Sequence, residues 1–268
     1  MKTDIIMPCW EGNNNLELIN SLNSLINNEK LINKIIIVID GCKEFPEFLP
    51  EKHILAKKIL FVYQFVNRGP GASRNTGVIF SKSENIIFLD TGDKCSKNRI
   101  KTQINSLTKY DVSVGHIKEI KNKNYSSIRF SAKNINKARK IIPYRTPFNN
   151  VTIAMKRVKY IELGGYPVYR TAEDWLFMGK IIKNKLKLLC ENKILVYIDK
   201  DDLFIFRRRG KSVFKDISLC IEELYELGLI NKYQKFISKN IQRFLRLYLP
   251  KIFLKIIFFL LRKNVIQT

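Results

Sequence analysis

Residues 34–40 read KIIIVID, and residues 85–90 read NIIFLD. Each is a short run of mainly branched apolar residues that ends in an aspartate, which is typical of a strand buried on both faces of a sheet. Residues 5–9 and 59–65 are two more apolar runs of strand length, and residues 16–31 space their apolar residues as a helix does. This alternation predicts an α/β layer with a largely parallel sheet.

The later part of the chain is expected to be less uniform. Residues 110–147 are polar and basic, and are expected to be less regular. Residues 173–182 have helical spacing, residues 186–197 suit one or two closing strands, and from residue 217 the pattern is helical to the end. We therefore expect a sheet flanked by helices and followed by a helical tail.

Composition narrows the possible functions. The 268 residues include 48 Lys and Arg against 24 Asp and Glu, a formal net charge of +24, which implies an anionic partner: nucleic acid, an anionic lipid surface or a phosphorylated substrate. The five cysteines are scattered without a C-x-x-C pair, and the two histidines, His53 and His116, are isolated. These features argue against a disulfide framework, a zinc site and a His-based hydrolase, and for a reducing compartment. No secretory signal is expected, and no run reaches the ~20 apolar residues that span a bilayer.

Carboxylates stand at two predicted strand ends. Asp40 and Asp90 end their strands at the edge where α/β proteins bind ligands. Asp93 follows Asp90 across a glycine turn, and hard divalent cations prefer carboxylate oxygens. The alternative is an acidic turn that merely ends a strand. The motif alone leaves both readings open.

A glycine-rich loop, NRGPGASRNTG at residues 67–77, opens into a helix predicted at residues 73–80. Glycines permit close backbone approach, and a helix N-terminus favours phosphate. The loop matches neither the Walker pattern nor G-x-G-x-x-G, so it is a weak phosphate signal. The Arg74-Asn75 pair within it is more distinctive.

Two further groups could carry chemistry. Glu173-Asp174 begins a predicted helix, where it could supply a general base or simply offset the helix dipole. Arg208 and Arg209 belong to a dense basic cluster, which is either a diphosphate clamp or a solvated loop.

Together, five motifs resemble in order and spacing those of the family 2 inverting glycosyltransferases, which have the GT-A fold. They are MPCWE at residues 7–11, Asp40 in IVIDG, GPGASRNTG at residues 69–77, LDTGD at residues 89–93, and GGY at residues 164–166 followed by Glu173-Asp174. The resemblance covers essentially the whole chain. Arg208-Arg209-Gly210 and the basic helix that follows are similar to those of amylovoran-type and O-antigen transferases.

The resemblance implies a GT-A-type, Rossmann-like mixed sheet flanked by helices, with a basic amphipathic helical tail. It implies that a nucleotide-sugar, expected to be a UDP-sugar, is bound by Pro8, Trp10, Glu11, Asp40, Asn67, Arg74, Asn75 and Asp90. It further implies Asp174, next to Glu173, as the general base, and weaker diphosphate or acceptor contacts from Arg208 and Arg209.

One departure from the family pattern concerns the metal. The family usually has a carboxylate where this chain has Gly92. Asp93 is therefore the expected direct ligand of a Mg²⁺ or Mn²⁺ ion, and Asp90 is expected to contact the ribose or to support the metal indirectly.

The Q-x-x-R-W motif of processive synthases is missing from the sequence. Its absence favours transfer of a single sugar over polymerisation.

The expected activity is transfer of one sugar, with a β-linkage, to an undecaprenyl-diphosphate-linked saccharide in the synthesis of O-antigen, capsule or exopolysaccharide. Residues 1–216 would form the catalytic domain, with a donor half at about 1–100 and an acceptor half at about 101–216. Residues 217–268 would form the tail. No acidic residue follows Glu226, and basic and aromatic residues alternate there, which suits an anionic membrane surface. The expected location is cytoplasmic, at the inner face of a bacterial plasma membrane.

Two rival interpretations remain at this stage. Charge alone would allow a nucleic-acid-binding protein, but no helix-turn-helix, RRM signature or zinc module supports one, so no nucleic-acid partner is expected. Gly92 would allow a catalytically inactive, membrane-bound relative.

Overall fold

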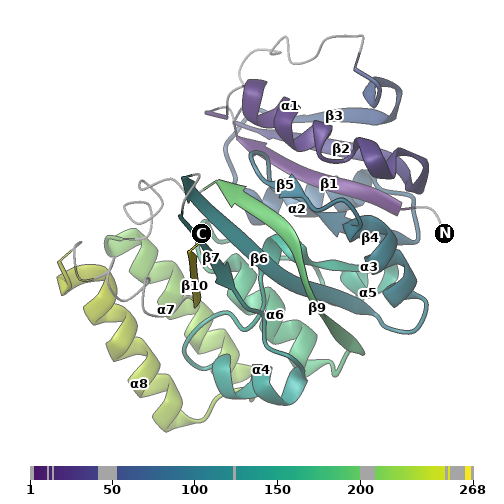
Figure 1. The fold of residues 1–268 in the computed structure, drawn as a ribbon. Helices are drawn as coiled ribbons and strands as arrows, with labels where there is room; N and C mark the ends of the chain where they lie inside the picture. The colour runs from purple at the N-terminus through teal and green to yellow at the C-terminus, as the bar shows by residue number, and fades with distance from the viewer. Residues whose placement is uncertain are drawn as a thin grey trace.

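The computed structural model describes residues 3–10, 12–13, 15–41, 53–122, 125–199, 209–250, 253 and 263–266. These residues form a mixed, twisted sheet with helices on both faces (Figure 1). Helices α7 and α8 lie at one end of the molecule, and α1 lies with β1, β2 and β3 at the other.

The strands are β1 (Thr3–Trp10), β2 (Ile32–Asp40), β3 (Ile59–Gln64), β4 (Asn85–Phe88), β5 (Lys94–Cys95), β6 (Val112–Asn122), β7 (Tyr125–Arg129), β8 (Ala154–Lys156), β9 (Leu188–Asp199) and β10 (Lys263–Ile266). The main path of the sheet is β10-β7-β6-β8-β4-β1-β2-β3. Strands β4, β1, β2 and β3 run parallel to one another, whereas β8 is antiparallel to β4 and to β6. The carboxyl ends of β1 to β4 therefore share one edge, where α/β proteins bind ligands.

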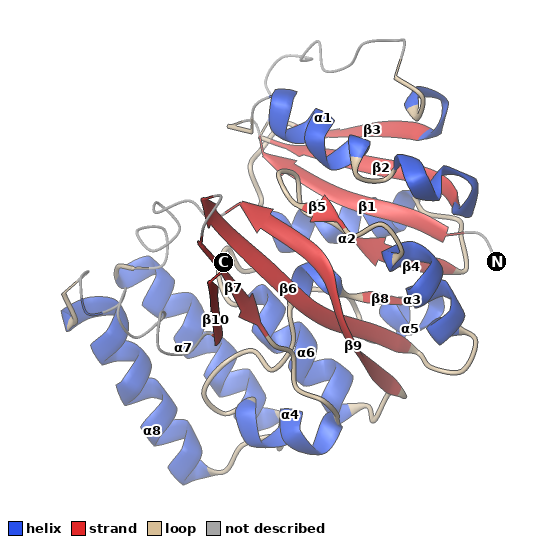
Figure 2. Ribbon diagram, viewed as in Figure 1, coloured by secondary structure: helices blue, strands red, loops and turns tan. Residues whose placement is uncertain are grey.

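The α-helices are α1 (Asn15–Asn23), α2 (Pro70–Phe80), α3 (Arg99–Leu107), α4 (Ile135–Ile141), α5 (Arg157–Glu162), α6 (Glu173–Lys183), α7 (Lys211–Glu226) and α8 (Lys232–Arg243). Figure 2 shows them distributed around the sheet. None of the helices within the described ranges has the length and apolar character that crossing a bilayer requires.

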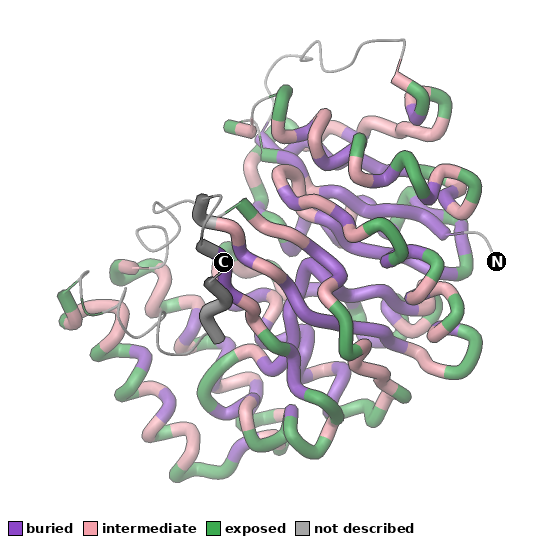
Figure 3. Tube along the Cα trace, in the orientation of Figure 1, coloured by how far each residue is buried: buried purple, intermediate pink, exposed green. Residues whose placement is uncertain are grey.

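Alternating side chains of the central strands build a core on each face of the sheet. Ile6, Ile36 and Val38 pack on the side of α6 and α7, whereas Ile5 and Ile37 pack on the side of α1 and α3. Figure 3 shows these strands buried along most of their length. Burial on both faces explains why they appear in the sequence as continuous apolar runs rather than as alternating ones.

The four predicted strands at the start of the chain are confirmed as β1 to β4, although β4 ends at Phe88, two residues earlier than expected. The helix predicted over residues 16–31 is shorter. Helix α1 ends at Asn23, and a 3₁₀ segment (Ile26–Leu31) follows. The hydroxyl of Ser24 donates to the carbonyl of Ser21 at 2.6 Å, a local bond that competes with continuation of a helix.

The prediction that residues 110–147 are less regular than the rest of the chain is wrong. This segment contains β6, β7 and α4. Polar residues of the two strands are buried in mutual hydrogen bonds; for example, the Ser127 hydroxyl donates to Glu119 at 3.2 Å. Hydrophobic periodicity does not detect strands whose inward-facing groups are polar and paired.

The tail differs from expectation in two respects. Helix α7 begins at Lys211 and runs across the boundary expected between residues 216 and 217, and its Ile217, Cys220, Ile221 and Leu224 belong to the core. The chain is also not helical to its end, because a π-helical turn (Phe244–Tyr248) follows α8 and residues Lys263–Ile266 form β10, antiparallel to β7.

Candidate active site

The carboxyl end of β2 places Asp40 beside Trp10 of β1, which is its register partner. Asp40 is buried, and its two carboxylate oxygens accept from the backbone N–H groups of Arg68 (2.8 Å) and Gly69 (2.7 Å). The strand end and the glycine-rich loop are therefore fixed to each other by charge-assisted hydrogen bonds.

The glycine-rich loop packs tightly against the start of α6. A Cβ atom at Gly71 would lie 2.9 Å from Cγ of Glu173, so this glycine is required for the close approach of α6. Arg170, which precedes α6, donates from Nη2 to the carbonyl of Asn67 at 2.9 Å. The loop thus joins α6 to the edge of the sheet where the carboxyl ends of β1 to β4 lie, which we call the donor edge.

Arg74 of α2 occupies the centre of the site and is only 2 % exposed. Its Nη2 donates to both oxygens of Asp90 (2.7 and 3.0 Å), and its Nη1 donates to Glu173 at 3.3 Å. With the amide of Asn150 oriented so that its nitrogen donates to the Tyr166 hydroxyl, its oxygen accepts from both terminal nitrogens of Arg74 at 3.2 Å. The arginine therefore bridges the carboxylate that follows β4 and the carboxylate that begins α6.

Asn75, the next residue, holds the turn that leads toward α6. Its Nδ2 donates to the Tyr166 carbonyl, and its Oδ1 accepts from the Tyr166 N–H, both at 2.9 Å. The Tyr160 hydroxyl also donates to Oδ1. The described contacts of Asn75 thus join it to the Gly164-Gly165-Tyr166 turn and to Tyr160 of α5.

The turn after β4 carries Asp90 and Asp93. The Thr91 hydroxyl donates to the Pro8 carbonyl at 3.0 Å, which ties the turn to β1, and Gly92 has a φ of +97°. Asp93 is 8 % exposed, and among the described residues no group donates a hydrogen bond to its carboxylate. Burial, with the neighbouring charge of Asp90, raises the pKa of Asp93 well above its ordinary value.

Glu173 and Asp174 begin α6 in different surroundings. Glu173 is buried, and burial, with the charge of Asp174, raises its pKa to about 7 against the opposing effect of Arg74. Asp174 is partly exposed, and none of the described residues donates a hydrogen bond to its carboxylate. Of the two, Asp174 is the carboxylate that an incoming molecule could reach.

The remaining predicted residues lie at the margin of this arrangement or outside it. Trp10 is exposed at the end of β1, and Pro8 precedes it on the same strand. Arg209 leads into α7, next to Gly210, whose N–H donates to the Arg246 carbonyl at 3.3 Å. Glu11 and Arg208 lie outside the described residues.

Sequence reasoning did not identify Asn150, Arg99 or Arg129. Asn150 joins Arg74 to Tyr166, as described above. The guanidinium of the fully buried Arg99 donates to the carbonyls of Phe88 and Val151, both at 2.8 Å. Both Arg99 and Arg129 lower the pKa of Asp93. Arg99 begins α3 and Asn150 begins a 3₁₀ segment (Asn150–Thr152), but no local pattern distinguishes any of the three from a solvated polar residue.

A divalent cation at this edge of the sheet would be bound by oxygen ligands. Among the described residues, no three His, Cys, Asp or Glu side chains are grouped as a metal-binding cluster. Mg²⁺, however, commonly binds through one or two carboxylates together with substrate phosphates and water. Asp93, whose carboxylate accepts no hydrogen bond from the described residues, fits that smaller requirement, whereas both oxygens of Asp90 accept from Arg74.

The mixed sheet flanked by helices has a GT-A-type fold. The model of the family described as "Glycosyl transferase family 2" matches residues 4–164, and the chain belongs to that family. The match spans β1, the turn after β4 and the Asn75-bound turn up to Gly164.

Individual relatives agree with this assignment. A Haemophilus influenzae protein named "Uncharacterized glycosyltransferase" is 27 % identical over 246 residues, which cover 85 % of this chain and 87 % of that protein. The crystal structure of S. aureus TarS 1–349 superposes with a TM-score of 0.64 at 18 % identity, covering 91 % of this chain and 72 % of that one. A structure of TarS 1–349 in complex with UDP-GlcNAc gives 0.63 at 17 % identity, over 91 % and 73 %. These structures share the fold.

Proposed function

We propose that this protein transfers a single sugar, with inversion, from a UDP-sugar to a lipid-diphosphate-linked saccharide. The observation that carries the proposal is the bridge from Asp90 through Arg74 to Glu173, because it couples the donor edge of the sheet to the first turn of α6. Asp174 follows Glu173 directly, so the same contacts position a reachable carboxylate near the donor edge. The UDP-GlcNAc and UDP complexes of TarS support the choice of nucleotide.

In the proposed reaction, Asp174 accepts the proton of the acceptor hydroxyl as general base. The hydroxyl oxygen attacks C1 of the sugar from the face opposite the diphosphate, the bond from C1 to the phosphate oxygen breaks, and the nucleoside diphosphate leaves. A single displacement converts an α-linked donor into a β-linked product. Arg74 acts as a positioning residue, since its guanidinium is buried against protein groups.

The donor would lie along the strand ends. Pro8, Trp10, Glu11 and Asp40 would contact the nucleotide, while Asn67, Arg74 and Asn75 would shape the loop beneath it. Asp93 would hold a Mg²⁺ or Mn²⁺ ion, which when bound stabilises negative charge on the departing diphosphate. Arg209, with Arg208, would contact the diphosphate or the acceptor.

The acceptor proposal rests on the surface formed by α8. One face of α8 packs on the protein: Gln242 donates to the Tyr144 carbonyl at 3.1 Å, and Lys235 pairs with Glu222 of α7 at 2.7 Å. The exposed apolar residues of α8 and of the π-helical turn that follows it are Tyr233, Phe236, Ile241, Phe244 and Tyr248, and we call them the α8 outer face. Aromatic side chains among Lys and Arg favour the interface of an anionic membrane.

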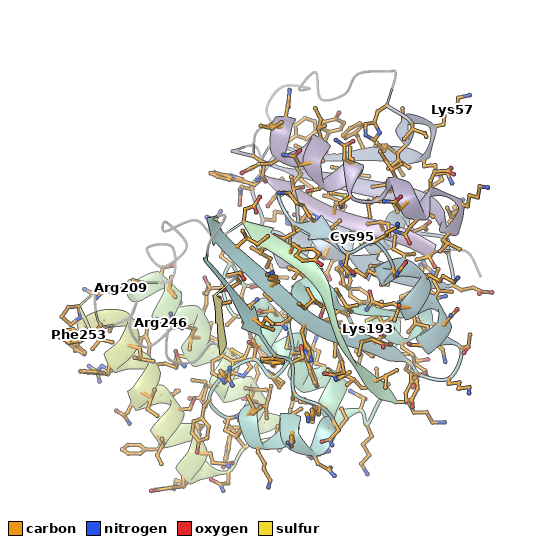
Figure 4. All side chains as sticks on the ribbon, viewed as in Figure 1. Lys57, Cys95, Lys193, Arg209, Arg246 and Phe253 are labelled. Carbon is orange, nitrogen blue, oxygen red and sulfur yellow. The ribbon has the colours of Figure 1, made fainter. Side chains whose placement is uncertain are left out.

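Arg209, Arg246 and Phe253 lie toward one end of α8 in Figure 4, where the Gly210 N–H donates to the Arg246 carbonyl at 3.3 Å and Phe253 is exposed. A protein held peripherally on the inner face of a bacterial plasma membrane by this surface would meet lipid-diphosphate acceptors where they are found. This location is consistent with a role in O-antigen, capsule or exopolysaccharide synthesis.

The test is direct. A synthetic undecaprenyl-diphosphate-linked saccharide is incubated with the protein and a panel of sugar nucleotides, and the product is analysed by mass spectrometry and for anomeric configuration. The expected result is the addition of one β-linked sugar from a UDP-sugar. Addition of an α-linked sugar would contradict inversion, and absence of transfer from every donor would contradict the proposed function.

A further inference from the structure

The turn between Asp90 and Asp93 contains a position without a side chain, and a carboxylate from another element lies beside it. A Cβ atom built at Gly92 would lie 4.0 Å from Cδ of Glu17, and no other heavy atom of the described structure, outside the flanking residues, lies within 4 Å. The φ of Gly92, +97°, disfavours an aspartate at this position. The backbone of the turn therefore favours glycine, and the carboxylate that would lie against this position, flanking residues apart, comes from the first turn of α1.

The first turn of α1 is fixed relative to this turn by hydrogen bonds. The hydroxyl of Ser21 accepts from the Gly92 N–H at 2.9 Å and donates to the Glu17 carbonyl at 3.0 Å. Glu17 and Ser21 are one helical turn apart, so they share a face of α1. The position of Glu17 beside Gly92 is thus supported by the backbone of both elements.

Asn13, at the donor edge of the sheet, also orients the carboxylate of Glu17. Nδ2 of Asn13 donates to Oε2 of Glu17 at 2.8 Å, and Oδ1 of Asn13 accepts from the Trp10 N–H at 2.9 Å. The same asparagine therefore contacts the end of β1 and holds the carboxylate. A carboxylate held in this way is pre-organised for a ligand at that edge.

Asp93 provides an independent indication of a ligand at this turn. The residue is 8 % exposed, yet no group of the described chain donates a hydrogen bond to its carboxylate. Burying an ionised carboxylate without a partner is costly, so such a group is expected to meet a cation or a donor that a ligand brings.

We propose that Glu17 is a ligand of the divalent cation that accompanies the donor diphosphate, and that it supplies from α1 the carboxylate that position 92 cannot carry. This inference rests on the proposed function. Two protein carboxylates, Glu17 and Asp93, together with phosphate oxygens and water, satisfy the preference of Mg²⁺ or Mn²⁺ for oxygen ligands. The departure at Gly92 is then a relocation of a ligand rather than a sign of an inactive relative.

The experiment compares Mn²⁺ binding, measured by electron paramagnetic resonance in the presence of saturating UDP, in the full chain and in two variants. Glu17→Gln keeps the length of the side chain and removes its charge. Glu29→Gln is the matched control, because it removes the same charge from the 3₁₀ segment after α1. Glu29 pairs there with Lys58 at 2.7 Å. UDP binding in EDTA is measured by calorimetry for all three proteins.

We expect Glu17→Gln to weaken Mn²⁺ about tenfold to 100-fold, Glu29→Gln to leave it unchanged, and neither variant to alter UDP binding in EDTA. Glu17→Asp, which retains the charge on a shorter side chain, is expected to bind Mn²⁺ with intermediate affinity. If Glu17→Gln does not fold, the Mn²⁺ affinity of Glu17→Asp tests whether Glu17 is a ligand.

Three results would overturn the inference while leaving the proposed function in place: equal Mn²⁺ affinity in Glu17→Gln and the unaltered protein, equal loss of Mn²⁺ affinity in Glu29→Gln, or UDP binding by the unaltered protein that Mn²⁺ does not affect. Failure of the unaltered protein to bind UDP at all would instead refute the proposed function itself, and the inference with it.

Discussion

At the level of single residues, Glu173 and Asp174 show how adjacent carboxylates acquire different roles. Glu173 is buried against Arg74, whereas Asp174 is partly exposed and accepts no hydrogen bond from the described residues. Such a division lets the first residue position the helix while the second meets the acceptor. It also allows the two side chains to be tested separately.

Asp174→Asn is expected to lower kcat about 100-fold or more while leaving UDP binding nearly unchanged, because a general base contributes chiefly to the transition state. Steady-state kinetics and calorimetry with UDP measure the two effects. Glu162→Gln, an exposed change on α5, serves as the control. Retention of a near-normal kcat by Asp174→Asn would show that another group is the base.

Asp93→Ala is expected to lose Mn²⁺-dependent activity more completely than Asp90→Ala. The physical reason is that both oxygens of Asp90 already accept from Arg74, while Asp93 has no such donor among the described residues. Activity is titrated with Mn²⁺ for each variant, with Asp93→Asn included to preserve side-chain volume. Unchanged Mn²⁺ affinity in the Asp93 variants would rule out this ligand.

Glu173 should make stability depend on pH. Its pKa is raised from 4.5 to about 7 in the folded protein, so between these values the native state keeps a proton that the unfolded chain has released. The free energy of unfolding therefore falls as pH rises through this window, by at most about 3 kcal/mol. Urea denaturation at pH 5 and pH 8 measures this change, and Glu173→Gln is expected to reduce it. An equal pH dependence in the variant would contradict the assignment.

At the level of elements, the turn before α6 depends on Asn75 and on the glycine that Asn75 approaches. A Cβ atom at Gly165 would lie 2.5 Å from Oδ1 of Asn75, whereas a Cβ atom at Gly164 would meet nothing within 4 Å. Both glycines have positive φ, 65° and 70°, so alanine imposes similar backbone strain at each. The two positions thus differ mainly in the contacts with Asn75 and Tyr160.

Gly165→Ala is therefore expected to destabilise the protein about 1–3 kcal/mol more than Gly164→Ala, because it must displace buried hydrogen bonds as well as strain the backbone. Chemical denaturation of the two variants gives the difference. Asn75→Ala, which removes the same bonds without the steric clash, is expected to resemble Gly165→Ala. Equal stability of the two glycine variants would mean that Asn75 does not hold the turn.

At the level of the whole molecule, the α8 outer face is expected to bind anionic membranes. The double variant Phe236→Ser, Phe244→Ser should lower binding to phosphatidylglycerol vesicles several-fold, since both rings are exposed (67 % and 54 %) and would enter the interface. Val158→Ser, Ile161→Ser on α5 is the control, because α5 lies away from α8 (Figure 1).

Vesicle sedimentation at low and high salt measures the effect. Surface substitutions are preferred to removal of residues 231–268, because α8 packs on α7 and donates to the Tyr144 carbonyl, so a truncated chain would expose buried groups. Loss of binding in the α5 control to the same degree would show that the interaction is not specific to α8.

Much of the fold was predictable from local patterns. The apolar runs of β1 to β4 reflect burial on both faces, and Asp40 lies at the end of β2 as expected. The polar strands β6 and β7 were not predictable, because Glu119 and Ser127 are buried by pairing with each other rather than by apolar character. The sequence of a strand does not reveal whether a polar residue within it has such a partner.

The same limit applies to the site. The order of the motifs along the chain predicted the family, and the motifs themselves contained the carboxylates near the strand ends. Both were readable because each motif is local. The Arg74–Glu173 pair joins residues 99 positions apart, and Gly92 meets α1 through Ser21, 71 positions away. Folding of the whole chain created these contacts, because hydrogen bonds and close approaches between distant segments depend on how the helices pack on the sheet.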